Sequence, residues 1–186
     1  SWVAPGPSLA VVGRPVAHSL SPAIHNAALA AMAKSRPALA SWRYHKFDIA
    51  PADLPRALQL FHRQGFVGLN LTVPHKALAV EHLAASDAFV RAAGAANTLI
   101  RIDAGWKGAN TDGGGLSAAL REEFGLELAG ADVILLGAGG AARAAAVECL
   151  RSHCASLAVG NRTASTLAAL VAELRPFAGE TNLTGF

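Results

Sequence analysis

Apolar runs of strand length alternate with segments of helical periodicity in the first half of the chain. Strand-forming residues fill 9–13, 42–49 and 66–73, and glycine or proline ends each run or follows it closely. Between them, 21–32 starts with serine and proline, and 54–65 places apolar residues on one helical face before a glycine. This β-α-β-α-β order predicts an α/β fold: a three-layer α/β/α domain with a mainly parallel sheet and right-handed crossovers.

Shorter elements follow the third strand. We expect a helix over 77–84 and a second, shorter helix from Ser86. Turn-forming residues at 103–105 then predict a hairpin in which 96–101 pairs with 106–110. The hairpin returns the chain to the region where the third strand ends.

Asp112 and three glycines begin the next helix, expected over 113–124. Glycine costs roughly 1 kcal/mol relative to alanine in a helix, so we expect another body, such as a cofactor or a second domain, to approach closely there. The alternative for Asp112 is capping of the helix and interaction with its dipole. We therefore divide the chain into a first domain (1–112), a connecting helix and linker (113–130) and a second domain (131–186).

The second domain opens with a glycine-rich turn between a strand and a helix. A continuous apolar run at 132–136 leads into Gly137-Ala138-Gly139-Gly140-Ala141-Ala142, an alanine-rich helix follows, and a second strand is expected at 155–159. In this context the glycines permit a tight turn and let backbone N–H groups at the helix N-terminus face a pyrophosphate. The pattern predicts a dinucleotide-binding domain, and the alternative is a plain strand-to-helix turn.

Asn161, Arg162 and Thr163 follow the second of these strands, where an enzyme that uses NAD usually carries Asp or Glu. A guanidinium there suits the 2′-phosphate of NADP, through its charge and its forked donors. The alternative is a solvated surface arginine. After a helix over 165–174 the chain ends at Phe186. About two strands of a sheet that usually has six are therefore expected, and we expect the native chain to be longer.

Composition excludes several classes of function. The chain has 16 Lys and Arg residues against 13 Asp and Glu, a net charge of +3 that suits small anionic ligands. These basic residues are scattered, so no nucleic-acid surface is expected. The 7 histidines show no metal-binding spacing, and no metal is expected. Cys149 and Cys154 predict two free thiols in a reducing compartment.

The sequence gives no sign of a membrane segment or a secretory leader. No apolar run approaches the length of a membrane span. Ser1–Gly6 lack a basic region followed by an apolar one, so we expect neither insertion nor export. Because an initiating methionine is missing, we expect the numbering to start either inside the gene product or at residues added to it by cloning.

Three polar motifs lie near expected strand ends in the first domain. In Gly68–Lys76 the strand stops at Pro74, so Asn70, Thr72 and Lys76 should converge at one edge of the sheet. The alternative is a buried strand with a polar edge and a solvated lysine. The other two motifs are His18-Ser19-Leu20-Ser21-Pro22, on the first strand-to-helix loop, and Asn110-Thr111-Asp112-Gly113. On local grounds, helix capping by Ser21 is at least as good an interpretation as ligand binding.

Taken in their order along the chain, the three motifs and the glycine-rich fingerprint resemble the shikimate dehydrogenases, including their quinate-using relatives. The resemblance runs from about Val11 to Thr163. The resemblance implies that 1–112 is a substrate-binding catalytic domain and that 131–186 is the first half of a Rossmann NADP-binding domain. It implies reversible, NADPH-dependent reduction of 3-dehydroshikimate to shikimate, in the chorismate pathway of aromatic amino acid biosynthesis. A cytoplasmic monomer or homodimer acting on a small-molecule substrate is expected. The alternatives are a dual-specificity quinate/shikimate dehydrogenase and a truncated, non-catalytic shikimate-binding module.

The resemblance also assigns expected roles to individual residues. Lys76 and Asp112 would be the catalytic pair, with the proton work between them undivided. Ser19 and Ser21 would hold the substrate carboxylate, and Thr72, Asn97 and Asp112 would contact the ring hydroxyls. Lys76 would also belong to the substrate-binding set. NADP would contact residues of the glycine-rich turn and of the following strand end: Gly137, Ala138, Gly139, Gly140, Ala141, Asn161, Arg162 and Thr163. The family's substrate-binding glutamine and its nicotinamide-side contacts have no counterpart in this chain.

Overall fold

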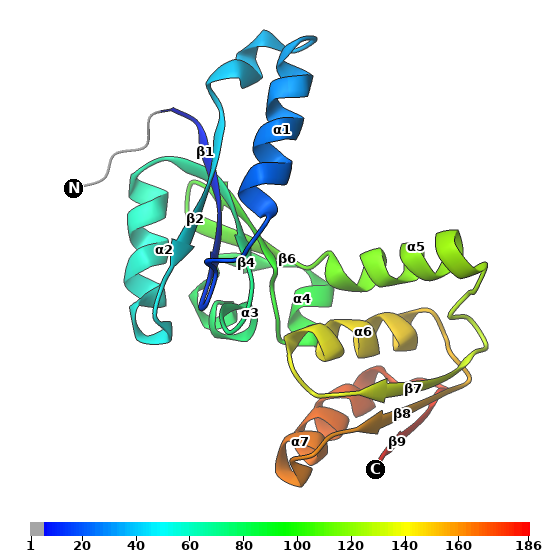
Figure 1. Cartoon of the computed structure of the whole chain (residues 1–186). Helices are drawn as coiled ribbons and strands as arrows, with labels where there is room; N and C mark the ends of the chain where they lie inside the picture. Colours follow the sequence, from blue (N-terminus) through cyan, green and yellow to red (C-terminus); the bar gives the residue numbers. More distant parts are fainter. Residues whose placement is uncertain (1–5) are drawn as a thin grey trace. The chain divides into compact units, whose positions relative to one another are not determined.

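The computed structural model describes residues 6–186, so the expectation about a leader at residues 1–6 lies almost entirely outside the described part. The chain divides into two compact units, each built from two stretches of sequence. The first unit contains the chain up to Ser86 and Ala96–Ala109, and the second contains Asp87–Ala95 and Asn110–Phe186. The predicted division at residue 112 lies close to one of these crossings and misses the other two. Figure 1 follows the chain through both units.

A mixed sheet forms the centre of the first unit. Its strands among the described residues are β1 (Ser8–Gly13), β2 (Arg43–Asp48), β3 (Phe66–Leu71), β4 (Ala85–Ser86), β5 (Thr98–Ile102) and β6 (Gly105–Ala109). Their order is β2-β1-β3-β5-β6-β4. The predicted parallel part is confirmed, because β1 pairs in parallel with both β2 and β3. The predicted hairpin is confirmed as well, since β5 and β6 pair in antiparallel fashion.

Two of the predicted helices cover this sheet. Helix α1 (Ser21–Ala33) joins β1 to β2 and helix α2 (Leu54–Arg63) joins β2 to β3, on opposite sides of these strands (Figure 1). Leu54, Leu58 and Phe61 are the buried residues of α2, as the periodicity predicts. Phe61 packs against Phe66 of β3, with ring centroids 4.8 Å apart. This apolar contact fixes α2 on the sheet.

The helix predicted over 77–84 is wrong in length. Only α3 (His75–Leu78) and a 3-10 turn (Val80–His82) form there. The Ala84 N–H donates to the Trp106 carbonyl at 2.9 Å, and Ala85–Ser86 form β4 beside β6. Tertiary hydrogen bonding to β6 therefore outweighs the local helix propensity. The next helix begins after Asp87, whose carboxylate accepts the Val90 N–H at 2.7 Å.

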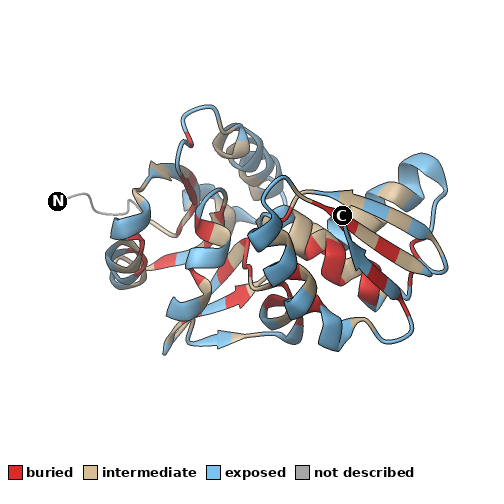
Figure 2. Cartoon of the chain, turned by 90° about the horizontal axis from the view of Figure 1, so that it is seen from below, coloured by how far each residue is buried: buried red, intermediate tan, exposed pale blue. Residues whose placement is uncertain are grey.

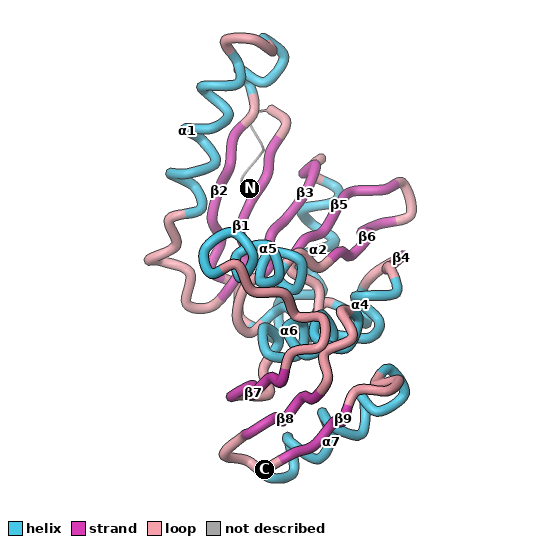
Figure 3. Tube along the Cα trace, turned by 90° about the vertical axis from the view of Figure 1, so that its right-hand side faces the viewer, coloured by secondary structure: helices cyan, strands magenta, loops and turns pink. Residues whose placement is uncertain are grey.

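The second unit contains a parallel sheet and four helices among the described residues. Its strands are β7 (Asp132–Leu136), β8 (Ser156–Gly160) and β9 (Asn182–Gly185), and its helices are α4 (Ala88–Ala93), α5 (Asp112–Phe124), α6 (Gly140–Arg151) and α7 (Ala164–Leu174). The sheet order is β7-β8-β9, and Figure 3 shows these strands side by side. The expectation of two strands is too low. β9 was missed because Leu183 is its one buried residue, which leaves no readable alternation.

Helix α6 supplies much of the core of the second unit. Buried residues of α6 and α4 belong to one apolar cluster, which includes Phe89, Ala93 and Leu150, and Figure 2 colours such buried positions red. This packing explains why the α4 segment belongs to the second unit. It also shows that residues 113–130 are part of that unit, because α5 packs along α6 instead of forming a separate link.

The three glycines at the start of α5 have different surroundings. A Cβ on Gly113 would lie 2.5 Å from the Phe89 ring and 3.1 Å from the Ala144 carbonyl oxygen, both in the same unit. Gly114 and Gly115 have nothing within 4 Å of an added Cβ. The close approach predicted for this run is therefore made at Gly113 by α4 and α6 themselves.

Within residues 6–186, no helix combines the length and the apolar character that a membrane crossing requires. Over the same residues, no group of three or more His, Cys, Asp or Glu side chains is arranged to bind a metal ion. Cys149 and Cys154 are free thiols, as predicted, and both are buried. Burial raises the pKa of the Cys149 thiol to about 11, so this side chain is a packed core residue at neutral pH.

Candidate functional site

The loop after β1 carries the first two predicted site residues, Ser19 and Ser21. The Ser19 N–H donates to the Val16 carbonyl at 3.0 Å, and the Ser19 hydroxyl oxygen accepts the Ser21 N–H at 3.3 Å. Helix α1 begins at Ser21, and Leu20, which precedes it, already has helical backbone angles. The helix-capping interpretation of Ser21 is therefore wrong. Its amide is instead bonded by Ser19, and its side chain hydrogen-bonds with Tyr44.

Tyr44 connects this loop to the centre of the sheet. It is buried on β2, and its hydroxyl donates to Asn70 Oδ1 of β3 at 2.7 Å. The Asn70 amide donates to Thr98 Oγ1 at 3.3 Å, and the Thr98 hydroxyl donates to Asn97 Oδ1 at 2.9 Å. Burial raises the pKa of Tyr44 to about 12, against a smaller opposing effect of the hydrogen bond with Ser21. A chain of hydrogen bonds thus links Ser21 with Asn97.

Thr72 and Lys76 follow the end of β3, as predicted. The Thr72 N–H donates to the Val12 carbonyl at 3.0 Å, and the Lys76 carbonyl accepts the Ala96 N–H at 2.8 Å. An added Cβ on Gly13 would lie only 2.3 Å from Thr72 Cγ2, so a glycine is needed at the end of β1. Both Thr72 and Lys76 are half-buried.

Asn97 is buried and held by its backbone on two sides. Its N–H donates to the Ala109 carbonyl at 3.1 Å, and its carbonyl accepts the Leu71 N–H at 2.8 Å. Asn97 directly precedes β5, which pairs with the carboxyl-terminal half of β3. The first unit therefore brings Ser19, Ser21, Thr72, Lys76 and Asn97 to the same end of its sheet.

Asp112 is the first residue of α5, in the second unit. Its backbone N–H donates to Asn110 Oδ1 at 2.9 Å. The side chain of Asn110 thus pairs with an N–H group that has no partner inside the helix. A carboxylate in the first turn of a helix interacts favourably with the helix dipole. This local role is compatible with a further role of the carboxylate in chemistry.

The glycine-rich turn of the second unit has the geometry that the fingerprint predicts. Gly137 has a φ of +116°, which favours glycine, and its N–H donates to the Gly160 carbonyl at 2.8 Å. Helix α6 starts at Gly140 after Gly139, without a side-chain cap. An added Cβ on Gly139 would meet nothing within 4 Å. The first N–H groups of α6 are thus accessible to a phosphate, and the residues present fit a dinucleotide.

Part of the predicted cofactor set lines one open cavity of the second unit. The cavity has a volume of about 560 Å³ and is lined by Leu136, Gly137, Gly160, Asn161, Arg162 and Phe186. Asn161 donates to the Thr163 carbonyl at 3.0 Å, which shapes the turn after β8. Arg162 is exposed at this turn, while Ala138 is buried beneath the glycine-rich turn. Ala138 therefore supports the turn through packing, and only its backbone could face a ligand.

Comparisons with known proteins agree with these observations. A family described as the shikimate dehydrogenase substrate binding domain matches residues 11–99. The NADP(+) shikimate dehydrogenase of Moorella thermoacetica is 45% identical over 155 residues, which are 83% of this chain and 50% of that protein. The chain belongs to the shikimate dehydrogenase family. It spans about half the length of the curated relatives it matches.

Solved structures of shikimate dehydrogenases share the fold of the chain. A crystal structure of a shikimate dehydrogenase in complex with NADP+ has a TM-score of 0.83 and 33% identity, and covers 100% of this chain and 63% of that one. The Thermus thermophilus enzyme in complex with NADP(H) and shikimate has a TM-score of 0.81 and 35% identity, with coverage of 97% and 63%. The similarity extends through both units, so the fold prediction is confirmed.

The residues near the candidate site that sequence reasoning missed are Tyr44, Thr98 and Phe186. Tyr44 and Thr98 join the hydrogen-bond chain, and Phe186 lines the cavity beside Arg162. Asn70 carried a readable signal, because it alternates with Thr72 along one strand. Tyr44 carried no readable signal, because its partner Asn70 is on β3, and β1 lies between β3 and the strand of Tyr44.

Proposed function

We propose that the protein to which this chain belongs is an NADP-dependent shikimate dehydrogenase that reversibly reduces 3-dehydroshikimate to shikimate. The observation that carries the proposal is the gathering of Ser19, Ser21, Thr72, Lys76 and Asn97 at one end of the first unit's sheet, inside the stretch that matches the family's substrate-binding domain. The proposal includes a soluble, cytoplasmic monomer or homodimer. Size-exclusion chromatography with light scattering checks the assembly.

The substrate carries a carboxylate and several ring hydroxyls, and the proposed contacts match these groups by chemistry. Ser19 and Ser21 hold hydroxyl donors for the carboxylate at the start of α1, where the helix dipole favours an anion. Thr72 and Asn97 supply uncharged donors and acceptors for ring hydroxyls. Asn97 is fixed through Thr98, so its amide orientation is set before substrate arrives.

Lys76 is the proposed proton donor to the substrate carbonyl. Reduction of a ketone places negative charge on its oxygen, and an ammonium held at that oxygen stabilises the charge and supplies the proton. The Lys76 carbonyl accepts a hydrogen bond from the Ala96 N–H, which limits movement of the backbone from which the lysine side chain extends. Asp112 is proposed to orient and tune the Lys76 amine and to contact a ring hydroxyl.

NADP is the proposed cofactor, and its nicotinamide supplies the hydride when bound. The turn Gly137, Ala138, Gly139, Gly140 and Ala141 would face the pyrophosphate with backbone N–H groups at the start of α6. Asn161, Arg162 and Thr163 would surround the adenosine ribose. Arg162 is the residue suited to the 2′-phosphate, because a guanidinium forms paired, charge-assisted hydrogen bonds with phosphate oxygens.

Steady-state kinetics of the full-length protein test this proposal. Shikimate with NADP should give reduced nicotinamide at a kcat/KM far above that for quinate with NADP or shikimate with NAD. Comparable rates with quinate would indicate the dual-specificity dehydrogenase. Binding of shikimate by calorimetry without any turnover would indicate a binding module, and no binding would overturn the proposal.

A further inference from the structure

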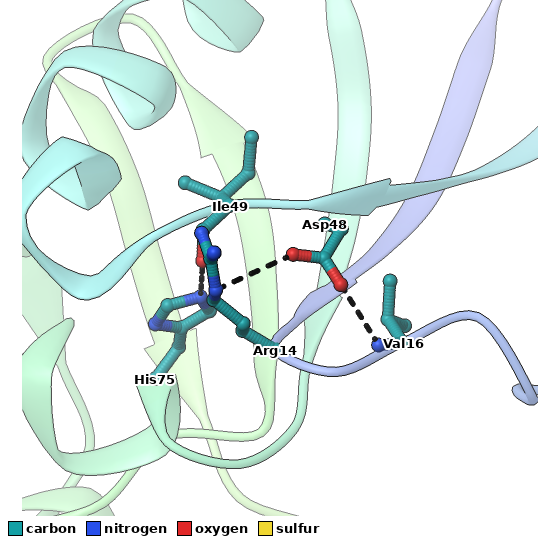
Figure 4. A network of polar contacts seen from close by, with 5 residues as sticks. All are labelled: Arg14, Val16, Asp48, Ile49 and His75. Carbon is teal, nitrogen blue, oxygen red and sulfur yellow. Dashed lines mark hydrogen bonds and ion pairs between the residues drawn. The ribbon is translucent and has the colours of Figure 1, made fainter.

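The carboxyl end of β2 is bonded to the loop that carries Ser19. Asp48, the last residue of β2, accepts the Val16 N–H at 3.3 Å and lies 3.8 Å from the Arg14 guanidinium (Figure 4). Lys46, also on β2, donates to the Ala17 carbonyl. The Arg14 pair is about half exposed, so it contributes little compared with the charge-assisted bond to a backbone amide. Two charge-assisted contacts therefore tie β2 to this loop, one from Asp48 to Val16 and one from Lys46 to Ala17.

The residue after Asp48 is bonded to the loop that carries Lys76. The Ile49 carbonyl lies 3.0 Å from Nε2 of His75, whose side chain is fully buried (Figure 4). A carbonyl only accepts hydrogen bonds, so Nε2 carries the proton and donates. The imidazole Nδ1 has no hydrogen-bond partner among the described residues. Burial lowers the pKa of His75, against smaller opposing effects of Ile49 and Asp48, so the ring is neutral at pH 7.

A buried imidazole with a single hydrogen bond is a costly choice for a packing residue. Its one bond, however, joins the first residue of α3 to the end of β2, immediately before Lys76. The His75 N–H also donates to the Thr72 carbonyl at 2.8 Å. His75 thus fixes both the start of α3 and the turn that precedes it, and Lys76 projects from the next position.

We propose that Asp48 and His75 are positioning residues, which hold the Ser19 loop and the Lys76 loop in register through the end of β2. This inference rests on the proposed function. Substitutions of Asp48 and of His75 should therefore change different kinetic parameters. The serines bind the carboxylate in the ground state and the transition state alike, so disturbing them raises KM, whereas disturbing Lys76 lowers kcat.

Variants of His75 in the full-length protein test the first half of the proposal. His75→Leu should lower kcat with shikimate by about tenfold or more, since small misplacements of a catalytic group are costly, and KM should change by less than about twofold. His75→Gln should recover most of the loss, because its side-chain amide reaches the position of Nε2 and can donate to Ile49. His75→Asn, whose shorter amide cannot reach Ile49, should resemble His75→Leu.

Variants of Asp48 test the second half. Asp48→Ala should raise the KM for shikimate by about tenfold, with kcat within about twofold of the wild type. Asp48→Asn keeps an acceptor for the Val16 N–H and should recover most of the affinity. Binding of shikimate measured by calorimetry should follow the same order as KM.

His62 provides a matched control. Its Nε2 lies 2.8 Å from the Ile102 carbonyl, so His62→Leu removes the same kind of bond in the same unit. Ile102 ends β5, which runs antiparallel to β3, so this bond lies at the other end of the sheet. His62→Leu should lower the unfolding temperature without the kinetic changes described above.

Each outcome decides the matter. A wild-type protein without activity on shikimate overturns the proposed function and the positioning roles together. An active wild type with equal kcat in His75→Gln and His75→Asn, or with kinetic losses in His62→Leu as large as in His75→Leu, overturns only the positioning roles. If His75→Leu does not fold, the comparison of Gln with Asn still decides, because both retain a polar side chain at the site.

Discussion

The two units hold their candidate site residues in different ways. In the first unit, hydrogen bonds join Ser21, Tyr44, Asn70, Thr98 and Asn97 across the sheet. In the second, the candidate cofactor-binding residues follow β7 and β8 and several are exposed. The side-chain bond from Asn161 to Thr163 is a local one within a single turn. A change in the first unit should therefore disturb neighbouring residues, whereas a change in the second should act on the ligand alone.

The largest expected effect concerns the proposed catalytic residues Lys76 and Asp112. Lys76→Ala and Asp112→Asn should each lower kcat by about 10²–10⁴, the usual range for loss of a general acid or base, with smaller changes in KM. The double variant should be little slower than either single variant, because residues that act as one unit are not additive. Steady-state kinetics of the full-length protein measure this.

Lys107→Ala, which removes an exposed lysine of β6, is the control and should behave as the wild type. Losses that multiply in the double variant would separate the roles of Lys76 and Asp112. The pairing of the two residues would then be wrong.

The next largest effect concerns cofactor selection in the second unit. Arg162→Ala should weaken NADPH by about ten- to a hundredfold in KM, since a charge-assisted contact contributes roughly 1.5–3 kcal/mol. NADH should be nearly unaffected, and Arg162→Asp should begin to favour NADH. Because Arg162 is exposed, the free energy of unfolding should change by less than about 0.5 kcal/mol.

Arg175→Ala, at another exposed arginine of the second unit, should leave both cofactors unaffected. Equal losses with NADPH and NADH in Arg162→Ala would remove Arg162 from the phosphate site. A clear loss of stability would contradict the view that residues of this turn act on the ligand alone.

A third prediction tests packing at the start of α5. Gly113→Ala would force a methyl group to within 2.5 Å of the Phe89 ring, so it should destabilise the chain by about 1–3 kcal/mol. Gly114→Ala meets nothing within 4 Å and should stabilise it by about 0.5–1 kcal/mol through helix propensity. Urea unfolding of both variants, followed by circular dichroism, gives the two values. Equal destabilisation would show that an added methyl is resisted at both positions.

The smallest expected effect concerns the hydrogen-bond chain of the first unit. Tyr44→Phe removes the hydroxyl that donates to Asn70 and leaves the ring, so it should cost about 0.5–1.5 kcal/mol of stability. The KM for shikimate should rise several-fold, because Ser21 and Asn97 both lose part of their orientation. An unchanged KM would contradict the coupling between these residues.

The pKa of Tyr44 gives an independent measure of the same chain. The folded-state pKa of about 12 lies above the ordinary value of 10.0, so the folded state binds more protons between these values. The contribution of Tyr44 to stability is therefore complete below pH 10 and is lost as the pH rises towards 12. Tyr44 is the single tyrosine of the chain, and Tyr44→Phe should remove this part of the alkaline dependence.

Local patterns in the sequence predict most of the fold. The glycine at residue 65, the proline after Ser21 and the buried face of α2 specify element ends and orientation directly. The prediction of a helix over 77–84 was wrong because the end of this segment bonds to β6 instead. The local sequence gives no information about that distant strand. The membership of α4 was unreadable for the same reason, since it depends on packing against α6, about fifty residues later.

The candidate site was predictable where chemistry and position coincide. Ser19, Thr72 and Lys76 follow strand ends in the sequence, and parallel strands bring such ends together. Tyr44, His75 and Asp48 were not predicted, because their importance arises from contacts between segments that only the strand order β2-β1-β3 brings together. The sequence therefore revealed residues suited to contact a ligand, but not the residues that position their side chains and loops.

The chain crosses between its units three times, and this path constrains how the protein can be synthesised. α4 emerges from the ribosome between β4 and β5, long before its partner α6 exists. Phe89 and Ala93, which share an apolar cluster with α6 in the finished structure, lack these partners while about fifty further residues are translated. The first sheet can close over that interval, but the nascent chain carries an apolar segment that a chaperone could bind until α6 arrives.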